Sequence, residues 1–426
     1  MNRSEFTLAQ WLVWMEASHP VAIDMGLGRC RQVYDNLHLS FSEISVFTIA
    51  GTNGKGSSVA MLDAILQAAD YRTACYTSPH LNRYNERIRF NGDQSSDAQL
   101  VAAFQAVDHA RGDISLTYFE MGTLAALWLI AKQKPDVALL EVGLGGRLDV
   151  VNLVDADVAV ITTIDIDHVD WLGDNRESIG REKAGIFRSH MPAVCGDLNP
   201  PKSIAEYAHS LKTPLYQAGE AFSLERHDNT WHWNGVDMAG TQVQLNDLPI
   251  PVLPLQNAAT ILQAIALSGL DVAYESIVMG LTRAKVAGRM DRFSHQGHDY
   301  LLDVAHNPQS ADYLARQLAM VNMPITLVLG MLSDKDCLKV IELLAPVIDQ
   351  WHLVGLDVMR GQTAEQLKVH WDKAVAPEPV PPVMCHSSVS ASIAYFASIR
   401  EPQFIVIAGS FHTVGQAYAA LGREVN

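Results

Sequence analysis

Short runs of apolar residues recur along the first half of the chain. The clearest are VFTI (46–49), RTACYTS (72–78), VALLEVG (137–143) and VAVITTI (158–164). Each run is continuous, as is typical of strands buried on both faces of a parallel sheet. Apolar residues at helical spacing over 97–110 and 119–131 predict helices between them. This half therefore predicts an α/β domain with a mainly parallel sheet.

The pattern changes twice after this region. Residues 214–256 contain alternating apolar positions and several prolines, which predict small antiparallel strands added to the first domain. Runs at 300–306, 325–331, 350–356 and 403–409 then predict a second, Rossmann-like α/β domain. Glycines and charges interrupt the periodicity near 286–297. We predict domains at 1–287 and 297–426, with 288–296 as a hinge or linker.

Composition narrows the class of protein. The 426 residues carry a formal net charge of −16, which argues against a broad nucleic-acid surface. The five cysteines are scattered without metal-binding spacing, as expected for reduced thiols in the cytoplasm. No apolar run approaches the ~20 residues of a membrane span, and Glu5 and Glu16 flank the apolar residues 11–15. We expect a cytoplasmic monomer without nucleic-acid or membrane partners.

The segment VFTIAGTNGKGSS (46–58) gives the clearest indication of a binding site. It runs from a strand through a glycine-rich turn into a helix that we predict to begin at Ser57. Turn N–H groups, the helix dipole and Lys55 would attract phosphate. The standard phosphate loop has glycine six residues before its lysine, whereas this chain has Ile49. A plain turn with a solvated Lys55 is the alternative. The order of features favours a nucleoside triphosphate site formed by Gly51, Thr52, Asn53, Gly54, Lys55, Gly56, Ser57 and Ser58.

Polar residues follow the other predicted strands, where open parallel sheets bind ligands. Ser78 follows the second run, Glu141 ends the third, and His168 follows the fourth. Hydroxyl, carboxylate and imidazole donors are suited to Mg²⁺, which a phosphate loop normally uses. Asp165 and Asp167 could equally cap a helix, and His168 could be a hydrogen-bonded strand-end residue. For Glu141 we favour a metal-binding role, because a carboxylate inside an apolar strand needs a partner to offset the cost of its burial.

Four further residues have competing interpretations. Lys183 lies in REKAG, where a solvated helix surface explains it equally well. Arg289 lies at the predicted domain junction, where a cation could meet a triphosphate or serve the fold. Asp303 and His306 end a strand in DVAHNP, a position that faces a ligand site, although capping by Asn307 is comparable.

The motifs together resemble the folylpolyglutamate synthase and dihydrofolate synthase family of the Mur-type ligase superfamily. The motifs that carry the resemblance occur in family order over nearly the whole chain: GTNGKGSS, TSPHL, NERI, YFEMGTLAAL, EVGLGGRLDVVN, IDIDHVDWLG with REKAGI, LQNAAT, AGRM, DVAHNP, GMLSDKD and GSFHTVG. The resemblance implies an ATP-dependent ligase that activates a folate-type carboxylate as an acyl phosphate and joins it to L-glutamate.

The resemblance also implies roles for individual residues. The first domain would be a phosphate-loop ATPase domain in which Ser57 and Glu141 bind one Mg²⁺. Ser78, Glu141 and His168 would bind a second. Lys183 matches the family's carbamylated lysine. The resemblance implies that the catalytic residues are Lys55, Lys183 and His168. The residues that would contact ATP outside the loop are Asn257, Arg289, Asp303 and His306.

The substrate expectation rests on two segments. AIDMGLGR (22–29) resembles the segment that helps hold dihydropteroate in bifunctional bacterial enzymes, and it contributes Asp24, Gly26 and Arg29. An acidic residue is expected before Arg29, where this chain has Gly28. Thr117 and Phe119 are the other candidates for the pterin-bearing substrate. The resemblance therefore implies dihydropteroate, tetrahydrofolate and L-glutamate as partners.

Three alternatives remain. A polyglutamylase without dihydrofolate synthase activity is scarcely separable by sequence. A cell-wall Mur ligase would usually carry a further N-terminal domain, and only about 45 residues precede the first predicted strand here. A guanine-nucleotide switch would need an Asn-Lys base reader, and the chain has no Asn-Lys pair.

Overall fold

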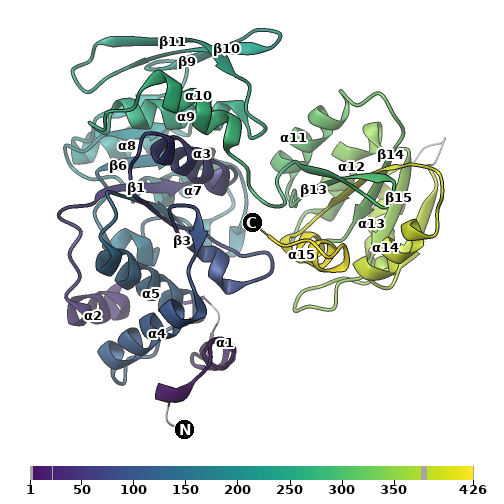
Figure 1. The fold of residues 1–426 in the computed structure, drawn as a ribbon, viewed down its shortest axis with the longest axis horizontal. Helices are drawn as coiled ribbons and strands as arrows, with labels where there is room; N and C mark the ends of the chain where they lie inside the picture. Colours follow the sequence, from purple (N-terminus) through teal and green to yellow (C-terminus); the bar gives the residue numbers. More distant parts are fainter. Residues whose placement is uncertain (1–2, 22, 376–380, 426) are drawn as a thin grey trace. The chain divides into compact units, whose positions relative to one another are not determined.

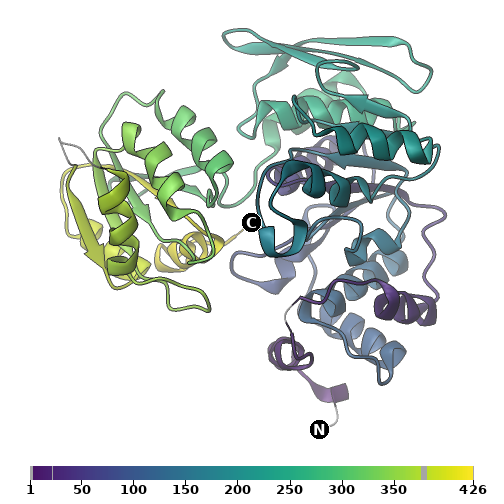
Figure 2. The ribbon, with the colours of Figure 1, turned by 180° about the vertical axis from the view of Figure 1, so that it is seen from behind.

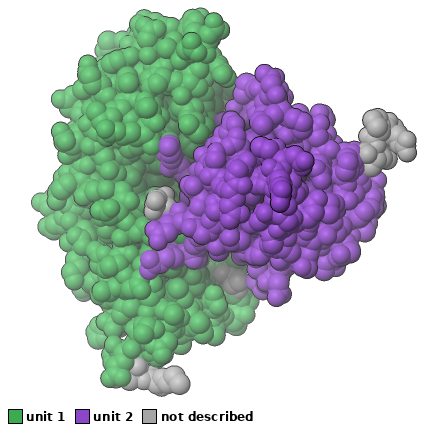
Figure 3. Space-filling view, turned by 45° about the vertical axis from the view of Figure 1, so that its right-hand side comes forward, with its two compact units in different colours: residues 1–79, 84–284 green, residues 80–83, 285–426 purple. Residues whose placement is uncertain are grey.

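The computed structural model describes residues 3–21, 23–375 and 381–425. The chain forms two compact units, which Figure 3 colours separately. Unit 1 comprises residues 1–79 and 84–284, and unit 2 comprises residues 80–83 and 285–426. The predicted linker interval contains strand β12 (Asp291–His295), and its role as a hinge stays a prediction.

Unit 1 is built on an eight-stranded sheet with the order β4-β3-β2-β5-β1-β6-β7-β8. Pairing is parallel from β2 to β8, while β3 and β4 add antiparallel edge strands. The strands are β1 (Ser45–Ala50), β2 (Thr73–Tyr76), β3 (Ile88–Phe90), β4 (Asp93–Gln94), β5 (Val137–Glu141), β6 (Val158–Ile161), β7 (Ala193–Cys195) and β8 (Leu215–Gln217).

Helices cover both faces of this sheet, as Figures 1 and 2 show from opposite sides. Strands β1 and β5 are almost wholly buried, which explains their continuous apolar runs. The helices of unit 1 are η1 (Arg3–Glu5), α1 (Leu8–Ala17), α2 (Gly28–Leu37), α3 (Lys55–Ala68), η2 (Tyr84–Arg87), α4 (Asp97–Arg111), α5 (Tyr118–Gln133), η3 (Val150–Leu153), α6 (Val169–Leu172), α7 (Arg176–Ala184), α8 (Lys202–Leu211), α9 (Leu255–Ala266) and α10 (Tyr274–Arg283).

The predicted antiparallel addition is present as a three-stranded sheet of β9 (Ser223–Arg226), β10 (Thr230–Val236) and β11 (Gln242–Pro249). It packs beside α9 and α10 (Figure 1). Alternate residues of β10 are buried, including Trp231 and Trp233, which gives this strand the period of two seen in the sequence. One detail differs from the prediction: β8, at the start of the 214–256 region, joins the main sheet in parallel.

Unit 2 contains a six-stranded sheet with the order β12-β13-β17-β14-β15-β16. All pairs are parallel except β12 with β13. Its remaining elements are β13 (His298–Asp303), β14 (Ile325–Leu329), β15 (Gln350–Val354), β16 (Val383–His386), β17 (Phe404–Ala408), α11 (Pro308–Leu318), α12 (Cys337–Leu344), η4 (Ala345–Val347), α13 (Ala364–Ala374), α14 (Val389–Ala397) and α15 (Phe411–Ala420).

Two hydrophobic clusters cover the faces of this second sheet. Phe404 and Val406 of β17 belong to one cluster, whereas Ile405 and Ile407 belong to the other. Successive side chains of a strand point to opposite faces, so a strand covered on both sides must be apolar throughout. The fold class predicted from the sequence is confirmed: a mainly parallel α/β domain with a small antiparallel addition, followed by a second α/β domain.

Candidate active site

The loop after β1 forms the predicted turn into α3. Gly54 adopts φ +84° and occupies the N-cap position of α3, a backbone conformation that favours glycine. A Cβ atom on Gly54 would lie 2.4 Å from Asn257 Nδ2, and one on Gly51 would lie 1.8 Å from Thr162 Oγ1. The helix begins at Lys55, two residues before the predicted start at Ser57. The turn is shorter than predicted because Gly54 is already the N-cap residue, with a left-handed backbone conformation.

Residues that follow β6 hold the loop after β1 in position through hydrogen bonds. The Thr52 N–H donates to the Thr163 carbonyl over 2.8 Å, and Thr162 Oγ1 donates to the Asn53 carbonyl over 2.6 Å. Thr52 Oγ1 also donates to the Asp165 carbonyl over 3.0 Å. Our sequence interpretation missed Thr162 and Thr163. Their signal was two adjacent hydroxyl residues at the end of a strand that could neighbour β1.

Lys55 bends back over this loop. Its Nζ donates to the carbonyls of Gly51 at 2.9 Å and Thr52 at 3.3 Å. Its charge also acts on Asp149, whose pKa rises to about 6 because burial outweighs the stabilisation from backbone N–H groups and Lys55. The loop therefore presents an ammonium group beside the N-terminus of α3, where anions are favoured.

Glu141 lies beside this loop at the end of β5. Strands β1 and β5 pair with Ile49 opposite Glu141, so the two strands end at the same edge of the sheet. The carboxylate is 5% exposed, and its Oε2 accepts the Ser78 N–H over 3.2 Å. A Cβ atom on Gly56 would lie 3.7 Å from the same oxygen. Glu141 thus brings an anionic oxygen next to Gly56 in the first turn of α3, one residue before the buried Ser57.

Lys183 is buried in α7, with 3% of its surface exposed. The alternative that it lies on a solvated helix surface is wrong, because its face of the helix is enclosed. Burial lowers the pKa of its ammonium group to about 7, and repulsion from Lys55 adds to this shift while Asp167 opposes it. The positive charge of Lys55 is therefore close enough to Lys183 to make the charged form of Lys183 less stable.

His168 follows β6 on an exposed turn. It is the N-cap residue of α6 with φ +53°. The Asp167 carboxylate accepts the His168 N–H, and the Asp165 carboxylate accepts the Ile166 N–H, both over 2.8 Å. Within the described residues, three or more His, Cys, Asp or Glu side chains do not gather in a metal-binding arrangement. The predicted ligand set has only two such side chains, Glu141 and His168, and its other donors are hydroxyls.

Most of the predicted substrate residues of unit 1 gather between α2 and α5. Arg29 pairs with Asp24, donates from Nε to the Ser115 carbonyl over 3.2 Å, and donates from Nη2 to Glu120 over 2.7 Å. Thr117 is the N-cap residue of α5, and the Phe119 ring packs against the backbone of Gly143. Gly26 precedes this group with open space around it, and Ala22, the first residue of the AIDMGLGR segment, lies outside the described residues.

The predicted ATP residues of unit 2 lie together at the end of β13. Asp303 accepts the N–H groups of Met290 at 2.9 Å and Ala305 at 2.8 Å. Burial raises the pKa of Asp303, while the charge of Arg289 opposes the rise. His306 Nδ1 contacts the Val304 carbonyl at 2.8 Å. The Asn307 side chain caps α11, as the alternative interpretation expected. Contact of Asp303 and His306 with ATP stays a prediction.

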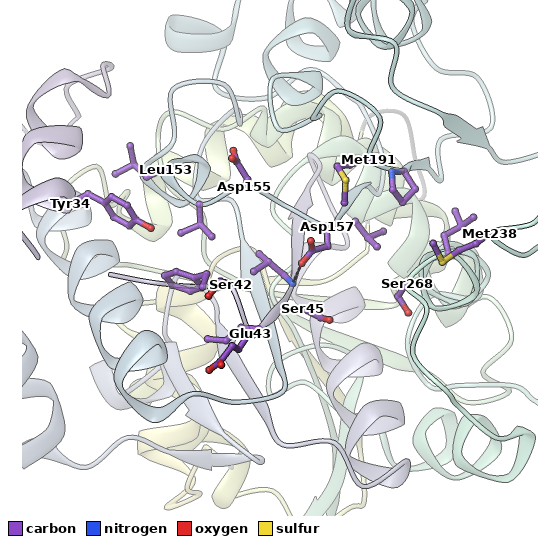
Figure 4. A pocket seen from close by; sticks show the side chains of 17 residues that line it. Tyr34, Ser42, Glu43, Ser45, Leu153, Asp155, Asp157, Met191, Met238 and Ser268 are labelled. Atoms are coloured by element: carbon purple, nitrogen blue, oxygen red, sulfur yellow. Dashed lines mark hydrogen bonds between the residues drawn. The ribbon is translucent and has the colours of Figure 1, made fainter. Parts of the chain in front are cut away.

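A separate cavity of about 700 Å³ lies elsewhere in unit 1 (Figure 4). Ser45 and Val158, the first residues of β1 and β6, line it, so it opens at the end of the sheet opposite the loop. The Asp157 carboxylate points inward and accepts the Val46 N–H over 2.8 Å. The cavity is therefore not part of the candidate active site.

Comparison with known proteins identifies the family. Residues 49–267 match the Mur ligase middle domain, and residues 288–411 match the Mur ligase, glutamate ligase domain. The chain is 43% identical over 409 residues to the dihydrofolate synthase/folylpolyglutamate synthase of Escherichia coli, covering 96% of this chain and 94% of that protein. The chain belongs to this family of Mur ligases. It is therefore an ATP-dependent acid–amino-acid ligase by membership.

Solved structures of family members share the whole fold. The structure of E. coli FolC in complex with DHPP and ADP matches with a TM-score of 0.92 and 42% identity, covering 99% of both chains. A bifunctional folylpolyglutamate synthase/dihydrofolate synthase from Yersinia pestis, complexed with AMPPNP and Mn ion, matches with a TM-score of 0.90 and 43% identity, covering 99% of this chain and 100% of that one. Nucleotide use by this ligase family thus agrees with the phosphate loop found in unit 1.

The described helices include none that is both long and apolar enough to cross a bilayer. The structure brings Glu141 beside the loop and buries Lys183, while the roles of these residues stay predictions. The site residues that the sequence analysis did not name are Thr162, Thr163, Asp149 and Glu120, which act on the loop, on the turn after β5 and on Arg29.

Proposed function

We propose that this ligase joins L-glutamate to dihydropteroate, giving dihydrofolate, and to tetrahydrofolate, extending its glutamate chain. An oxygen of the pterin-bearing carboxylate attacks the γ-phosphorus of ATP, and ADP leaves. The amine of L-glutamate then attacks the acyl carbon of the resulting acyl phosphate. Inorganic phosphate leaves and the amine loses a proton, so an amide bond forms.

One arrangement carries this proposal: the phosphate loop, with Lys55 above it and Glu141 beside it, in a chain of this family. Two anions must meet in the first step, so cationic groups and N–H donors are needed to offset their repulsion. The loop N–H groups and the α3 N-terminus supply fixed donors, and Lys55 supplies a mobile charge. The residues Gly51, Thr52, Asn53, Gly54, Gly56, Ser57 and Ser58 would hold the phosphates.

The donors near Glu141 fit magnesium ions. The Glu141 carboxylate lies beside Gly56, the residue before Ser57, and both Glu141 and Ser57 are buried. A carboxylate and a hydroxyl are hard oxygen ligands, which Mg²⁺ prefers. We assign Ser57 and Glu141 to one Mg²⁺, and Ser78, Glu141 and His168 to a second. When bound, the ions would neutralise charge on the phosphates. The lowered pKa of Lys183 leaves part of its amine neutral near pH 7. A neutral amine can add to carbon dioxide and lose a proton to give a carbamate, which supports a carbamylated Lys183 as a further anionic group.

The remaining roles divide between nucleotide and substrate. Asn257, which donates to the Gly54 carbonyl over 3.4 Å, would contact ATP from unit 1. Arg289, Asp303 and His306 would contact ATP from unit 2. The pterin-bearing substrate would occupy the region of Asp24, Gly26, Arg29, Thr117 and Phe119. An aromatic ring such as Phe119 offers a flat apolar face to a pterin.

Release of ADP tests the function. Purified protein is given MgATP and L-glutamate with dihydropteroate or with tetrahydrofolate, and the folate product is identified by mass. We expect turnover that requires all three substrates with each pterin compound. Omitting glutamate provides the matched control, because an acyl phosphate alone would give little steady ADP release.

Each other outcome has a defined meaning. Turnover with tetrahydrofolate alone would show a polyglutamylase and would contradict the role assigned to the AIDMGLGR segment. Absence of turnover with both compounds, from protein that still binds MgATP, would overturn the proposed substrates.

A further inference from the structure

Glu120 is a buried carboxylate on the first turn of α5, with 3% of its surface exposed. Both of its oxygens are engaged. Oε2 accepts the Thr117 N–H over 2.7 Å, and Oε1 accepts Nη2 of Arg29 over 2.7 Å. Glu120 therefore connects the start of α5 to α2, two elements far apart in the sequence.

The helix cap at the start of α5 does not by itself require the negative charge of Glu120. Thr117 and Glu120 form a reciprocal capping box, in which each side chain accepts the other residue's N–H. The same arrangement begins α1, α4 and α13, where the third helical residue is a glutamine: Gln10, Gln99 and Gln366. A neutral amide thus completes this cap elsewhere in the chain. A buried carboxylate is costly unless it is paired, so the charge of Glu120 is explained by Arg29.

Arg29 in turn is held from three directions. Besides Glu120, it pairs with Asp24 and donates to the Ser115 carbonyl. Its guanidinium is planar, so three fixed acceptors also fix its orientation. On the other side of Glu120, the first turn of α5 places Phe119 against Gly143. Glu120 lies between the two segments that we assign to the pterin-bearing substrate.

We propose that Glu120 is a positioning residue, which holds Arg29 and the first turn of α5 in the arrangement that receives the pterin-bearing substrate. The inference rests on the proposed function. Glu120 does not itself contact the substrate in this account, because its carboxylate is buried and faces Arg29 and the Thr117 N–H. It acts by limiting the motion of Arg29 and Thr117 before binding, which lowers the entropic cost of binding.

The variant Glu120→Gln separates the effect of the carboxylate charge from that of the helix cap. Glutamine preserves the capping box but removes the anion that pairs with Arg29. We expect the KM for dihydropteroate to rise about tenfold or more, the scale of losing one hydrogen bond between charged groups. We expect kcat to change by less than about threefold and the KM for ATP to stay unchanged. Steady-state ADP release measures all three quantities.

Asp108→Asn is the matched control. Asp108 is a half-buried carboxylate of α4 that pairs with Arg111 at 2.6 Å, as Glu120 pairs with Arg29. Its replacement should lower the thermal midpoint by a similar amount and leave the KM for dihydropteroate unchanged. Should Glu120→Gln fail to fold, Arg29→Lys provides the second variant. It keeps the positive charge but loses the planar fork, so the same rise in KM is expected.

A double-mutant cycle tests whether Glu120 acts through Arg29. In an Arg29→Met background, Glu120→Gln should change the KM for dihydropteroate by less than about twofold. Full additivity of the two changes would overturn the inference. So would an equal rise in the KM for ATP, or a lowered thermal midpoint with no change in KM. Failure of the proposed function would look different, because the wild-type protein itself would then not turn over either pterin substrate.

Discussion

Lys55 shows how one side chain depends on its local backbone. Its ammonium group donates to two loop carbonyls, at 2.9 and 3.3 Å, which keeps it over the turn instead of in solvent. These bonds are weak enough to exchange for phosphate oxygens, which attract a cation more strongly than neutral carbonyls do. The residue is therefore held near its site of action before any nucleotide binds.

Lys55→Ala should lower kcat by about 10²–10³-fold, the scale found when one donor to developing charge is removed. The variant should remain folded, since the side chain packs in no hydrophobic core. ADP release and circular dichroism measure the two properties. Lys339→Ala, which removes an exposed lysine paired with Glu342, serves as the control. Wild-type turnover by Lys55→Ala would end the assignment of the loop.

Lys183→Ala should lose activity by roughly 100-fold, the scale of losing a group that supports a metal site. If the lysine acts as a carbamate, small carboxylates such as formate or acetate should restore part of the activity by occupying the space that alanine leaves. Lys183→Arg is the control, because its guanidinium fills that space and should not respond. Equal responses of both variants, or of neither, would contradict the carbamate.

At the scale of elements, strands β15 and β16 bring two imidazoles into contact. His352 Nδ1 lies 2.8 Å from His386 Nε2, and the rings are stacked with centroids 5.0 Å apart. His352 is fully buried against Phe396, and its Nε2 has no hydrogen-bond partner among the described residues. Burial, with a smaller effect of His386, lowers the pKa of His352 to about 4, and burial also lowers the pKa of His386.

This pair predicts that unit 2 loses stability in acid. The His352 imidazole takes up a proton below about pH 6.5 in the unfolded chain, whereas in the folded chain it stays neutral until about pH 4. Stability is therefore complete above about pH 6.5 and falls as the pH drops toward 4. We expect a loss of roughly 1–2 kcal/mol between pH 6.5 and 5, measured by urea unfolding.

His352→Phe should flatten this dependence on pH, because the buried site then takes up no proton. The exposed His209 offers a control, since His209→Gln should leave the dependence as it is in the wild type. An unchanged slope in His352→Phe would show that other groups cause the acid sensitivity.

For the whole molecule, the main fact is that each hydrophobic cluster described above, within the described residues, belongs to one unit. One cluster packs on a face of the large sheet of unit 1, and two others cover the faces of the sheet in unit 2. Chains with more than one core often unfold in more than one step. The phosphate loop lies wholly in unit 1, while Arg289, Asp303 and His306 lie in unit 2.

Calorimetry should therefore resolve two transitions, or give a van't Hoff enthalpy smaller than the calorimetric one. A non-hydrolysable MgATP analogue at 100 times its Kd should stabilise the folded state that binds it by about 2.7 kcal/mol. Lys55→Ala should reduce this stabilisation at the same analogue concentration. A single transition with equal enthalpies would contradict the expected independence of the two cores.

The sequence by itself determined the features that depend on neighbouring residues. Buried parallel strands read as continuous apolar runs because both faces are covered, which is why β1, β5, β14 and β17 were predictable. The phosphate loop was equally readable, because a glycine turn between strand and helix is local backbone chemistry. Family motifs then implied roles that no local pattern supplies, such as those proposed for His168 and Lys183.

Only the tertiary structure decided the features that depend on distant residues meeting. Strand order placed β1 between β5 and β6, so Glu141 and the Thr162–Thr163 hydroxyls came to flank the loop. Burial of Lys183 was invisible in a charged helix, because exposure depends on what packs against it. The pairing of Glu120 with Arg29 joins positions 91 residues apart. Local periodicity carries no record of such contacts, since long-range packing alone brings them together.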